Sequence, residues 1–279
     1  MRFPPDMAPP GVDQTADTGS IKSRAQLIED LRQRIDAISA VASTGTDHLA
    51  VQGIRPPGRK TAEAPWLAIS IDGLNEVKPL NYPDTPAAVL FAQSLLIERT
   101  EARHSRPWLL VATAAVSREI GMVYGPGLAD FGAEPARLLL VEARSHSDGV
   151  AALEEGLRSG ALAGVLGLLD QVSVTEARRL QLAADGTATP CLLVSGHKSP
   201  PASVARNRWR VATRPSAPHP FDPRAPGRRR WQLTLERSQR GPAGRSWSVE
   251  WCDEARRLCL SPELAGRAAH PEKSASSAS

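Results

Sequence analysis

The sequence has few cysteines, few aromatic residues (4%) and no long apolar run. Its three cysteines, Cys191, Cys252 and Cys259, have no Cys or His neighbour at metal-ligand spacing, which argues against a structural zinc site and a disulfide framework. No segment approaches the roughly 20 apolar residues that a membrane span requires. The N-terminus lacks an apolar signal region, so we expect a cytoplasmic protein.

A phosphate-binding loop is also absent. The motif G-x-x-x-x-G-K-[ST], whose backbone amides and lysine hold phosphates, does not occur. The nearest text, residues 53–61, has one residue too many, contains two prolines and precedes a predicted strand instead of a helix. The usual position of the loop, between a predicted strand at 66–71 and a helix starting at Thr85, has no glycine beyond Gly73. Lys78 lies in this stretch, and we interpret it as a solvated loop lysine.

No complete catalytic constellation is present either. Asp170 ends a predicted strand, where a nucleotidase would keep a magnesium carboxylate, but capping of the following turn is the favoured role. Ser195 and His197 are too close in sequence to favour a dyad, and no G-x-S-x-G elbow exists. Glu154 and Glu155 fit a solvated helix face. We therefore predict no catalytic residue, no cofactor and no metal site, and hence no enzyme.

What the sequence does contain is an alternation of short apolar runs with amphipathic segments. Apolar runs at 66–71, 108–113, 137–143, 162–170 and 190–196 predict strands. Helices between them are predicted to begin at Thr85, near Ser147, and at Ser173 or Thr175, with Gly160 as a C-terminal cap. Strands that are apolar on both faces are typical of a parallel sheet covered by helices. The predicted class is therefore α/β.

The chain is predicted to divide into six segments. Residues 1–22 and 263–279 are poor in apolar residues and are expected to be disordered tails. A helix at 23–41 begins with a capping box at Ser23, and its apolar stripe needs a partner. A Pro- and Gly-rich linker follows at 42–64. The core domain covers 65–213, and a Pro/Arg-rich connection leads to a β-hairpin within 214–262, with a third strand at RRLCLS.

Basic residues are concentrated in the C-terminal third. The net charge is only +4, but residues 206–245 contain eleven arginines and two acidic residues, a local excess of +9. Guanidinium groups beside aromatic rings suit phosphate contact with base stacking, and they equally suit an acidic protein surface. The alternative is that the arginines keep the protein soluble and both tryptophans belong to the core. The predicted nucleic-acid or partner-binding residues are Arg206, Arg208, Trp209, Arg210, Arg228, Arg229, Arg230 and Trp231.

Six stretches of this chain resemble the ImuA family, the RecA-like, SulA-related proteins of a bacterial damage-inducible mutagenesis cassette, in their alphaproteobacterial type. They span about 66–260 and read DGLNEV (72–77), YGPGLADFGAEPARLLLVEAR (124–144), ALEEGLRSGALAGVLG (152–167), ARRLQLAAD (177–185), NRWRV (207–211) and SWSVEWCDEARRL (246–258). The resemblance implies a RecA-like parallel sheet flanked by helices and lacking a P-loop, with an N-terminal helix and a C-terminal β-hairpin extension.

The resemblance also implies a function. Members of the family act as non-catalytic accessory proteins in SOS-induced, error-prone translesion DNA synthesis, so the implied partners are an ImuB-type Y-family polymerase homologue and RecA, with single-stranded DNA as a further candidate. By analogy with RecA assembly, the helix at 23–41 would dock on a neighbouring molecule through Leu27, Ile28, Leu31 and Ile35. Three alternatives stay open: a SulA-like cell-division inhibitor, a single-stranded DNA-binding regulator, and a cryptic nucleotide hydrolase that uses Lys60 and Asp170.

Overall fold

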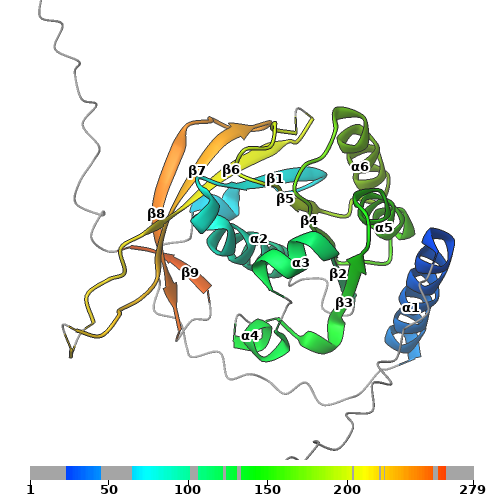
Figure 1. Cartoon of the computed structure of the whole chain (residues 1–279), viewed down its shortest axis with the longest axis horizontal. Helices are drawn as coiled ribbons and strands as arrows, with labels where there is room; N and C mark the ends of the chain where they lie inside the picture. The colour runs from blue at the N-terminus through cyan, green and yellow to red at the C-terminus, as the bar shows by residue number, and fades with distance from the viewer. Residues whose placement is uncertain are drawn as a thin grey trace, which may run out of the picture.

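The computed structural model describes residues 23–44, 65–100, 106–121, 124–130, 133–202, 204–219, 221–222, 224–253 and 257–261. At its centre lies a nine-stranded sheet in the order β3-β2-β4-β5-β1-β6-β7-β8-β9 (Figure 1). Six strands are parallel: β1 (Leu74–Pro79), β2 (Trp108–Thr113), β3 (Leu138–Ala143), β4 (Gly164–Leu168), β5 (Cys191–Val194) and β6 (Asn207–Arg214). Three continue the sheet antiparallel: β7 (Arg230–Ser238), β8 (Arg245–Cys252) and β9 (Arg257–Leu260).

The helices follow the predicted connections. They are α1 (Arg24–Thr44), α2 (Thr85–Thr100), α3 (Ala114–Ile120), α4 (Gly125–Asp130), α5 (His146–Ser159) and α6 (Val174–Thr187). Gly160 ends α5 in the left-handed conformation, as the sequence predicts. Of the two predicted caps, Ser173 and Thr175, it is Ser173 that begins α6, with a capping box to Glu176. Helix α3 is not predicted from the sequence. It begins because the Thr113 hydroxyl accepts a hydrogen bond from the Val116 amide at 3.3 Å.

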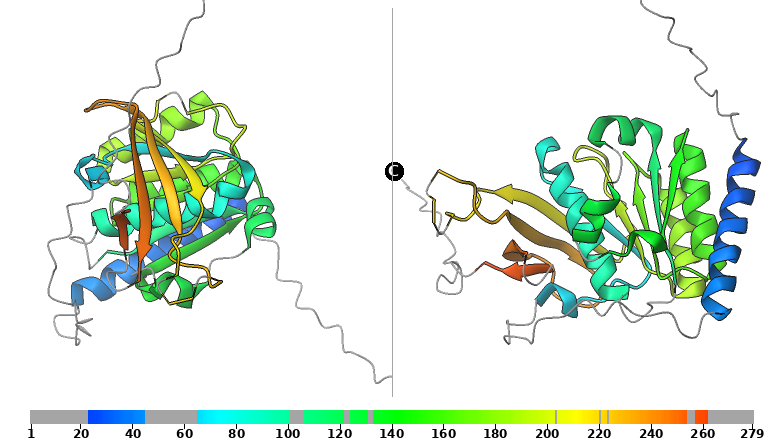
Figure 2. Two further views of the ribbon diagram at one scale, coloured as in Figure 1. Left: turned by 90° about the vertical axis from the view of Figure 1, so that its left-hand side faces the viewer. Right: turned by 90° about the horizontal axis from the view of Figure 1, so that it is seen from below.

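Two apolar cores lie on the two faces of the sheet. On one face, α5 and α6 pack against the parallel strands, and α1 lies outside α5 as a further layer (Figure 2). On the other face, α2 lies between the parallel strands and the antiparallel strands, which curve around it (Figures 1 and 2). Aromatic rings fill this second core: Phe91 of α2 contacts Trp209 edge to face at 5.3 Å, and Trp209 lies 5.9 Å from Trp247.

The first predicted strand is wrong in position. Residues 66–71 do not form a strand; Pro65–Ala68 is a 3-10 helix, in which Trp66 is buried, and β1 begins only at Leu74. The central strand is thus LNEVKP, with all six residues buried between β5 and β6. Apolar content favours 66–71, but three polar side chains of β1, those of Asn75, Glu76 and Lys78, each find a hydrogen-bond partner in the fold. Those partners come from segments more than 100 residues away in sequence.

The predicted α/β class, a parallel sheet flanked by helices with an antiparallel C-terminal extension, is confirmed. The predicted tails at 1–22 and 263–279 and almost all of the linker at 42–64 lie outside the described residues. None of the helices that the structure describes combines the length and the apolar character needed to cross a membrane.

Candidate functional site

The connection between β1 and α2 is where a parallel-sheet nucleotide-binding protein places its phosphate loop. In this chain it is residues 80–84, LNYPD, folded as a 3-10 helix at Tyr82–Asp84. The Asp84 carboxylate accepts the amides of Asn81 at 2.9 Å and of Thr213 at 2.8 Å, together with the Thr213 hydroxyl. Burial raises the pKa of Asp84, but these hydrogen bonds outweigh it and lower the pKa below its usual value. A phosphate at this position would meet a carboxylate in place of free amides.

Lys78 is not the solvated loop lysine that the sequence suggested. It lies within β1, is 2% exposed, and its ammonium donates to the carbonyls of Gly196 at 2.8 Å and Ser199 at 2.7 Å and to the Ser199 hydroxyl at 2.8 Å. Burial lowers the pKa of Lys78, while the attraction of Glu76 opposes that shift. With the Ser195 hydroxyl at 3.4 Å the ammonium has four oxygen partners inside the protein, so it is not available to a ligand phosphate. Its role is to hold the chain that follows β5.

Glu76 is the anion of the same buried network. Its carboxylate accepts the Ser195 hydroxyl at 2.8 Å, the Ala202 amide at 3.0 Å and the Arg208 guanidinium at 3.0 Å. The residue is 1% exposed, so a buried charge in the middle of the sheet is neutralised by Arg208 of the neighbouring strand β6. This network was missed at the level of sequence. The only signal in the sequence is the presence of Glu76 and Lys78 between the apolar run at 66–71 and the helix that begins at Thr85.

A cavity of about 130 Å³ opens at the carboxyl ends of β4 and β5, beside α2 and α3. This is the edge of an open parallel sheet where ligands generally bind. The ionisable side chains of its lining are Tyr82, Glu119, Asp170 and His197, with no lysine or arginine among them. Two carboxylates and no fixed cation make this cavity unsuited to a triphosphate. Nucleotide hydrolysis is therefore the alternative least supported at this edge; Lys60, its other proposed residue, lies outside the described residues.

The remaining residues considered for chemistry have structural partners. The Ser195 hydroxyl donates to Glu76 rather than to His197. Glu154 does not belong to a solvated face: it is 3% exposed and forms ion pairs with Arg158 and Arg179. No group of three or more His, Cys, Asp or Glu side chains in the described part of the chain is arranged to hold a metal ion.

The arginines of the predicted binding surface in the C-terminal third meet carboxylates in the folded protein. Most of its arginines form ion pairs with carboxylates: Arg206 with Asp185, Arg208 with Glu76, Arg210 with Glu236, and both Arg228 and Arg230 with Glu250. Three of these carboxylates, Glu76, Asp185 and Glu250, come from outside residues 206–245. The local excess of +9 counted along the chain is therefore smaller in the folded protein, because tertiary contacts bring anions to it.

The two tryptophans of the predicted surface belong to the core. Trp209 is fully buried and Trp231 is 4% exposed, both within the apolar core around α2. Neither ring presents a face on which a base could stack. The sequence left open the alternative that both tryptophans belong to the core, and the structure shows that they do. The arginines of the predicted surface therefore have no aromatic ring from Trp209 or Trp231 beside them on which a base could stack.

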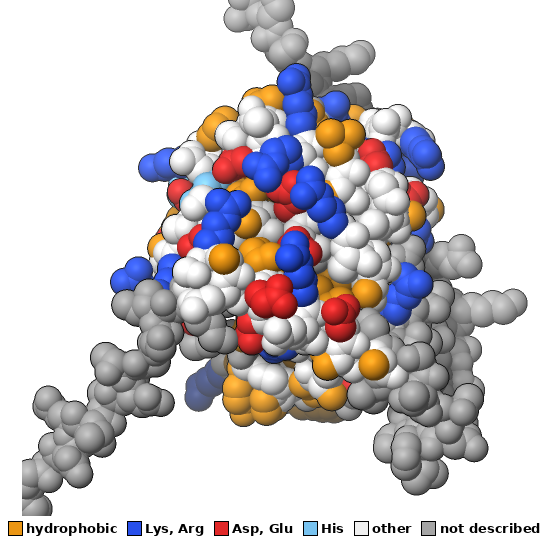
Figure 3. Space-filling model, turned by 90° about the vertical axis from the view of Figure 1, so that its right-hand side faces the viewer, with side chains coloured by type: hydrophobic (Ala, Val, Ile, Leu, Met, Phe, Trp, Pro, Cys, Tyr) orange, Lys and Arg blue, Asp and Glu red, His pale blue; other side chains and the backbone are white. Residues whose placement is uncertain are grey.

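The apolar stripe of α1 has its partner inside the chain. Leu31 and Ile35 are 1% and 2% exposed in the core formed with α5, and Leu27 packs beside them. The Arg32 guanidinium holds both Glu155 oxygens, at 2.7 and 3.0 Å. Around this layer, positive and negative side chains are intermixed (Figure 3). The stripe is thus occupied in this arrangement, which differs from docking on a neighbouring molecule.

Fold and site together define a class: an α/β protein with a helix-flanked parallel sheet, in which a 3-10 helix hydrogen-bonded through Asp84 stands at the position of the phosphate loop. No family model matches the chain. The chain is 30% identical over 140 residues to Protein ImuA of Caulobacter vibrioides strain NA1000 / CB15N, and equally to that of strain ATCC 19089 / CIP 103742 / CB 15. These matches confirm the resemblance to the ImuA family.

The match covers 46% of this chain and 56% of the relative, so the chain spans about half the length of the curated relatives it matches. Among solved structures, the RadB recombinase is similar with a TM-score of 0.46 and 12% identity, over 67% of this chain and 90% of that one.

Proposed function

We propose that the protein is a non-catalytic accessory component of SOS-induced, error-prone translesion DNA synthesis. The observation that carries the proposal is the combination of the ImuA match with a nucleotide position closed by Asp84 and flanked by carboxylates. A core that keeps the sheet but has no lysine or arginine in the described lining of its carboxyl-edge cavity has little means to stabilise a phosphoryl group there. Such a core can still present surfaces to other proteins, which is what an adaptor requires.

The proposed partners are the ImuB-type polymerase homologue and RecA. Contact through the arginines at 206, 208, 210 and 228–230, with DNA or with a partner, stays a prediction. The ion pairs of Arg206, Arg208 and Arg210 weaken the case for direct phosphate contact, because each guanidinium would have to give up a carboxylate of this chain. Binding of single-stranded DNA would be recognised by a steep fall of affinity with salt.

Two experiments test the proposal together. In cells that carry this gene, an in-frame deletion should lower the frequency of damage-induced mutations, and the intact gene should restore it. The purified protein should show no hydrolysis of ATP above a buffer blank. An unchanged mutation frequency would reject the role in lesion bypass, and the SulA-like alternative would then be tested by filamentation on overexpression. Robust nucleotide turnover by the pure protein would reject the non-catalytic assignment.

A further inference from the structure

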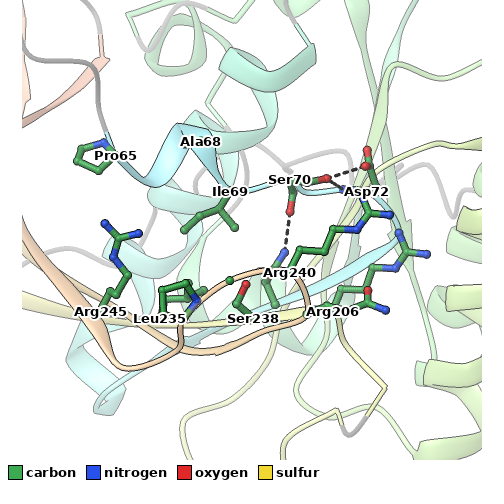
Figure 4. A pocket seen from close by; sticks show the side chains of 14 residues that line it. Pro65, Ala68, Ile69, Ser70, Asp72, Arg206, Leu235, Ser238, Arg240 and Arg245 are labelled. Atoms are coloured by element: carbon green, nitrogen blue, oxygen red, sulfur yellow. Dashed lines mark hydrogen bonds between the residues drawn. The ribbon is translucent and has the colours of Figure 1, made fainter.

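A second cavity lies at the opposite edge of the sheet, where β1 and β6 begin and β7 ends. It has a volume of about 290 Å³, and its wall is formed by the 3-10 helix at Pro65–Ala68, by Ser70 and Asp72, and by the turn between β7 and β8 (Figure 4). Its floor is apolar and includes Ile69 and Leu235. The size is at the lower end for small-ligand sites and is enough for one or two side chains of a partner.

Charge is distributed unequally around this cavity. Figure 4 shows Arg245 on one side and Arg206 with Asp72 on the other, with Arg240 between them. Arg206 is neutralised by Asp185 at 2.7 Å, and the Asp72 carboxylate accepts the Ser70 hydroxyl at 2.6 Å.

The two arginines of the turn differ from those on the strands. Within the described residues, neither Arg240 nor Arg245 forms an ion pair, although Arg245 lies over the Trp247 ring at 5.3 Å. Both side chains are exposed. The cavity thus combines an apolar floor with two guanidinium groups whose carboxylate partners are not supplied by the described chain.

We propose that this cavity binds a short acidic segment of a partner protein, with an apolar side chain of the segment on the floor and flanking carboxylates on Arg240 and Arg245. A carboxylate suits a guanidinium because two parallel hydrogen bonds can form. A peptide fits better than a nucleic acid, because the described lining contains no aromatic ring on which a base could stack. As an interaction of an adaptor, this assignment rests on the proposed function.

The direct test is an NMR titration of the full-length ¹⁵N-labelled protein with the peptide acetyl-EDLDE-amide. We expect saturable shifts confined to amides around the cavity, such as those of Ile69, Ser70 and Gly241. The variant Arg240→Glu/Arg245→Glu should bind this peptide about tenfold more weakly or worse, because two attractions become repulsions. The matched control is Arg214→Glu/Arg224→Glu, which changes the net charge equally with exposed arginines that do not line the cavity, and it should bind like the wild type.

Three results would overturn the proposal. The first is the absence of saturable shifts up to about 5 mM peptide. The second is equal binding of acetyl-KKLKK-amide or of acetyl-EDADE-amide, since either would show that charge or the apolar side chain does not matter. The third is equal loss of binding in both double variants. A fold check by circular dichroism on each variant separates lost binding from lost structure.

A cellular arm keeps this proposal distinct from the proposed function. If the deletion lowers damage-induced mutation and the Arg240→Glu/Arg245→Glu gene restores it fully, the adaptor role stands and the cavity is not its partner site. If the deletion has no effect while the peptide binds as expected, the proposed function fails and the binding site remains. Failure of the double variant to complement, with normal complementation by Arg214→Glu/Arg224→Glu, supports both.

Discussion

Replacement of Glu76 by glutamine tests whether the buried network holds the centre of the sheet together. The substitution preserves shape, and the amide oxygen can still accept the Ala202 amide and the Arg208 guanidinium, both at 3.0 Å. It removes the only carboxylate that is hydrogen-bonded to Arg208 in the described structure, and Lys78 nearby is also cationic and 2% exposed. Breaking a buried pair outright costs about 3–5 kcal/mol. Because the hydrogen bonds from Ala202 and Arg208 can persist and only the one from the Ser195 hydroxyl is lost, we expect the lower end, about 3 kcal/mol.

The assay is urea unfolding, followed by tryptophan fluorescence and by circular dichroism. The free energy of unfolding should fall by about 3 kcal/mol with an unchanged m-value, and Tm by about 6–12 °C. Glu142→Gln is the matched control, since Glu142 lies exposed on the edge strand β3, and its effect should stay within about 0.5 kcal/mol.

A double-mutant cycle identifies the cause of the loss. If the uncompensated guanidinium is responsible, adding Arg208→Met to Glu76→Gln should recover at least about 1 kcal/mol relative to additivity. Equal stability of Glu76→Gln and Glu142→Gln would refute the assignment of a structural ion pair. Additive losses would show that the charge of Arg208 is already solvated.

Three further outcomes are expected. Asp84→Asn should destabilise the protein by about 1–3 kcal/mol at neutral pH. Because the pKa of Asp84 is lowered, its carboxylate contributes to stability above the ordinary value near 3.8, and this contribution is lost as pH falls through the lowered pKa. The stabilities of wild type and variant should therefore converge in acid unfolding. A stability difference that stays constant with pH would contradict this. Burial raises the pKa of Cys191 to about 12, so iodoacetamide should modify Cys191 only after unfolding. Peptide mass spectrometry would detect the modification. If Cys191 of the native protein reacted as fast as a free thiol, its burial would be refuted. Leu31→Ala should lower the free energy of unfolding by about 2–4 kcal/mol, whereas the control Arg34→Ala, at an exposed position of the same helix, should have a negligible effect. Unchanged stability of Leu31→Ala together with an altered oligomeric state would favour docking of the helix on a neighbouring molecule instead.

The elements that were predicted well carry strong local signals. Strands β2 to β5 are apolar runs of the length of a buried strand, and helices α5 and α6 have capping residues in sequence, so both kinds of element are specified within a few residues. The hairpin of β7 and β8 shows the same locality, because alternating residues flank a Gly-rich turn in which Gly244 adopts φ +80°. The absence of a phosphate loop could also be read from the sequence.

The candidate site was less accessible because its partners are remote in sequence. Strand β1 was misplaced since its Asn, Glu and Lys read as loop residues, and only contacts with β5, β6 and the segment after β5 make their burial favourable. The cavity beside the β7–β8 turn likewise needs residues 65–72 to fold over that turn.

The sequence by itself determined the α/β class, most element boundaries, the family resemblance and the lack of a nucleotide-binding motif, because these depend on local periodicity and on short motifs. Tertiary structure alone decided which charges are free. Glu76, Asp185 and Glu250 neutralise arginines far along the chain, Trp209 and Trp231 close the core, and α1 covers its own stripe on α5. Coulomb attraction and apolar burial act between neighbours in space, so a count of charges along the chain cannot give the charge of a surface.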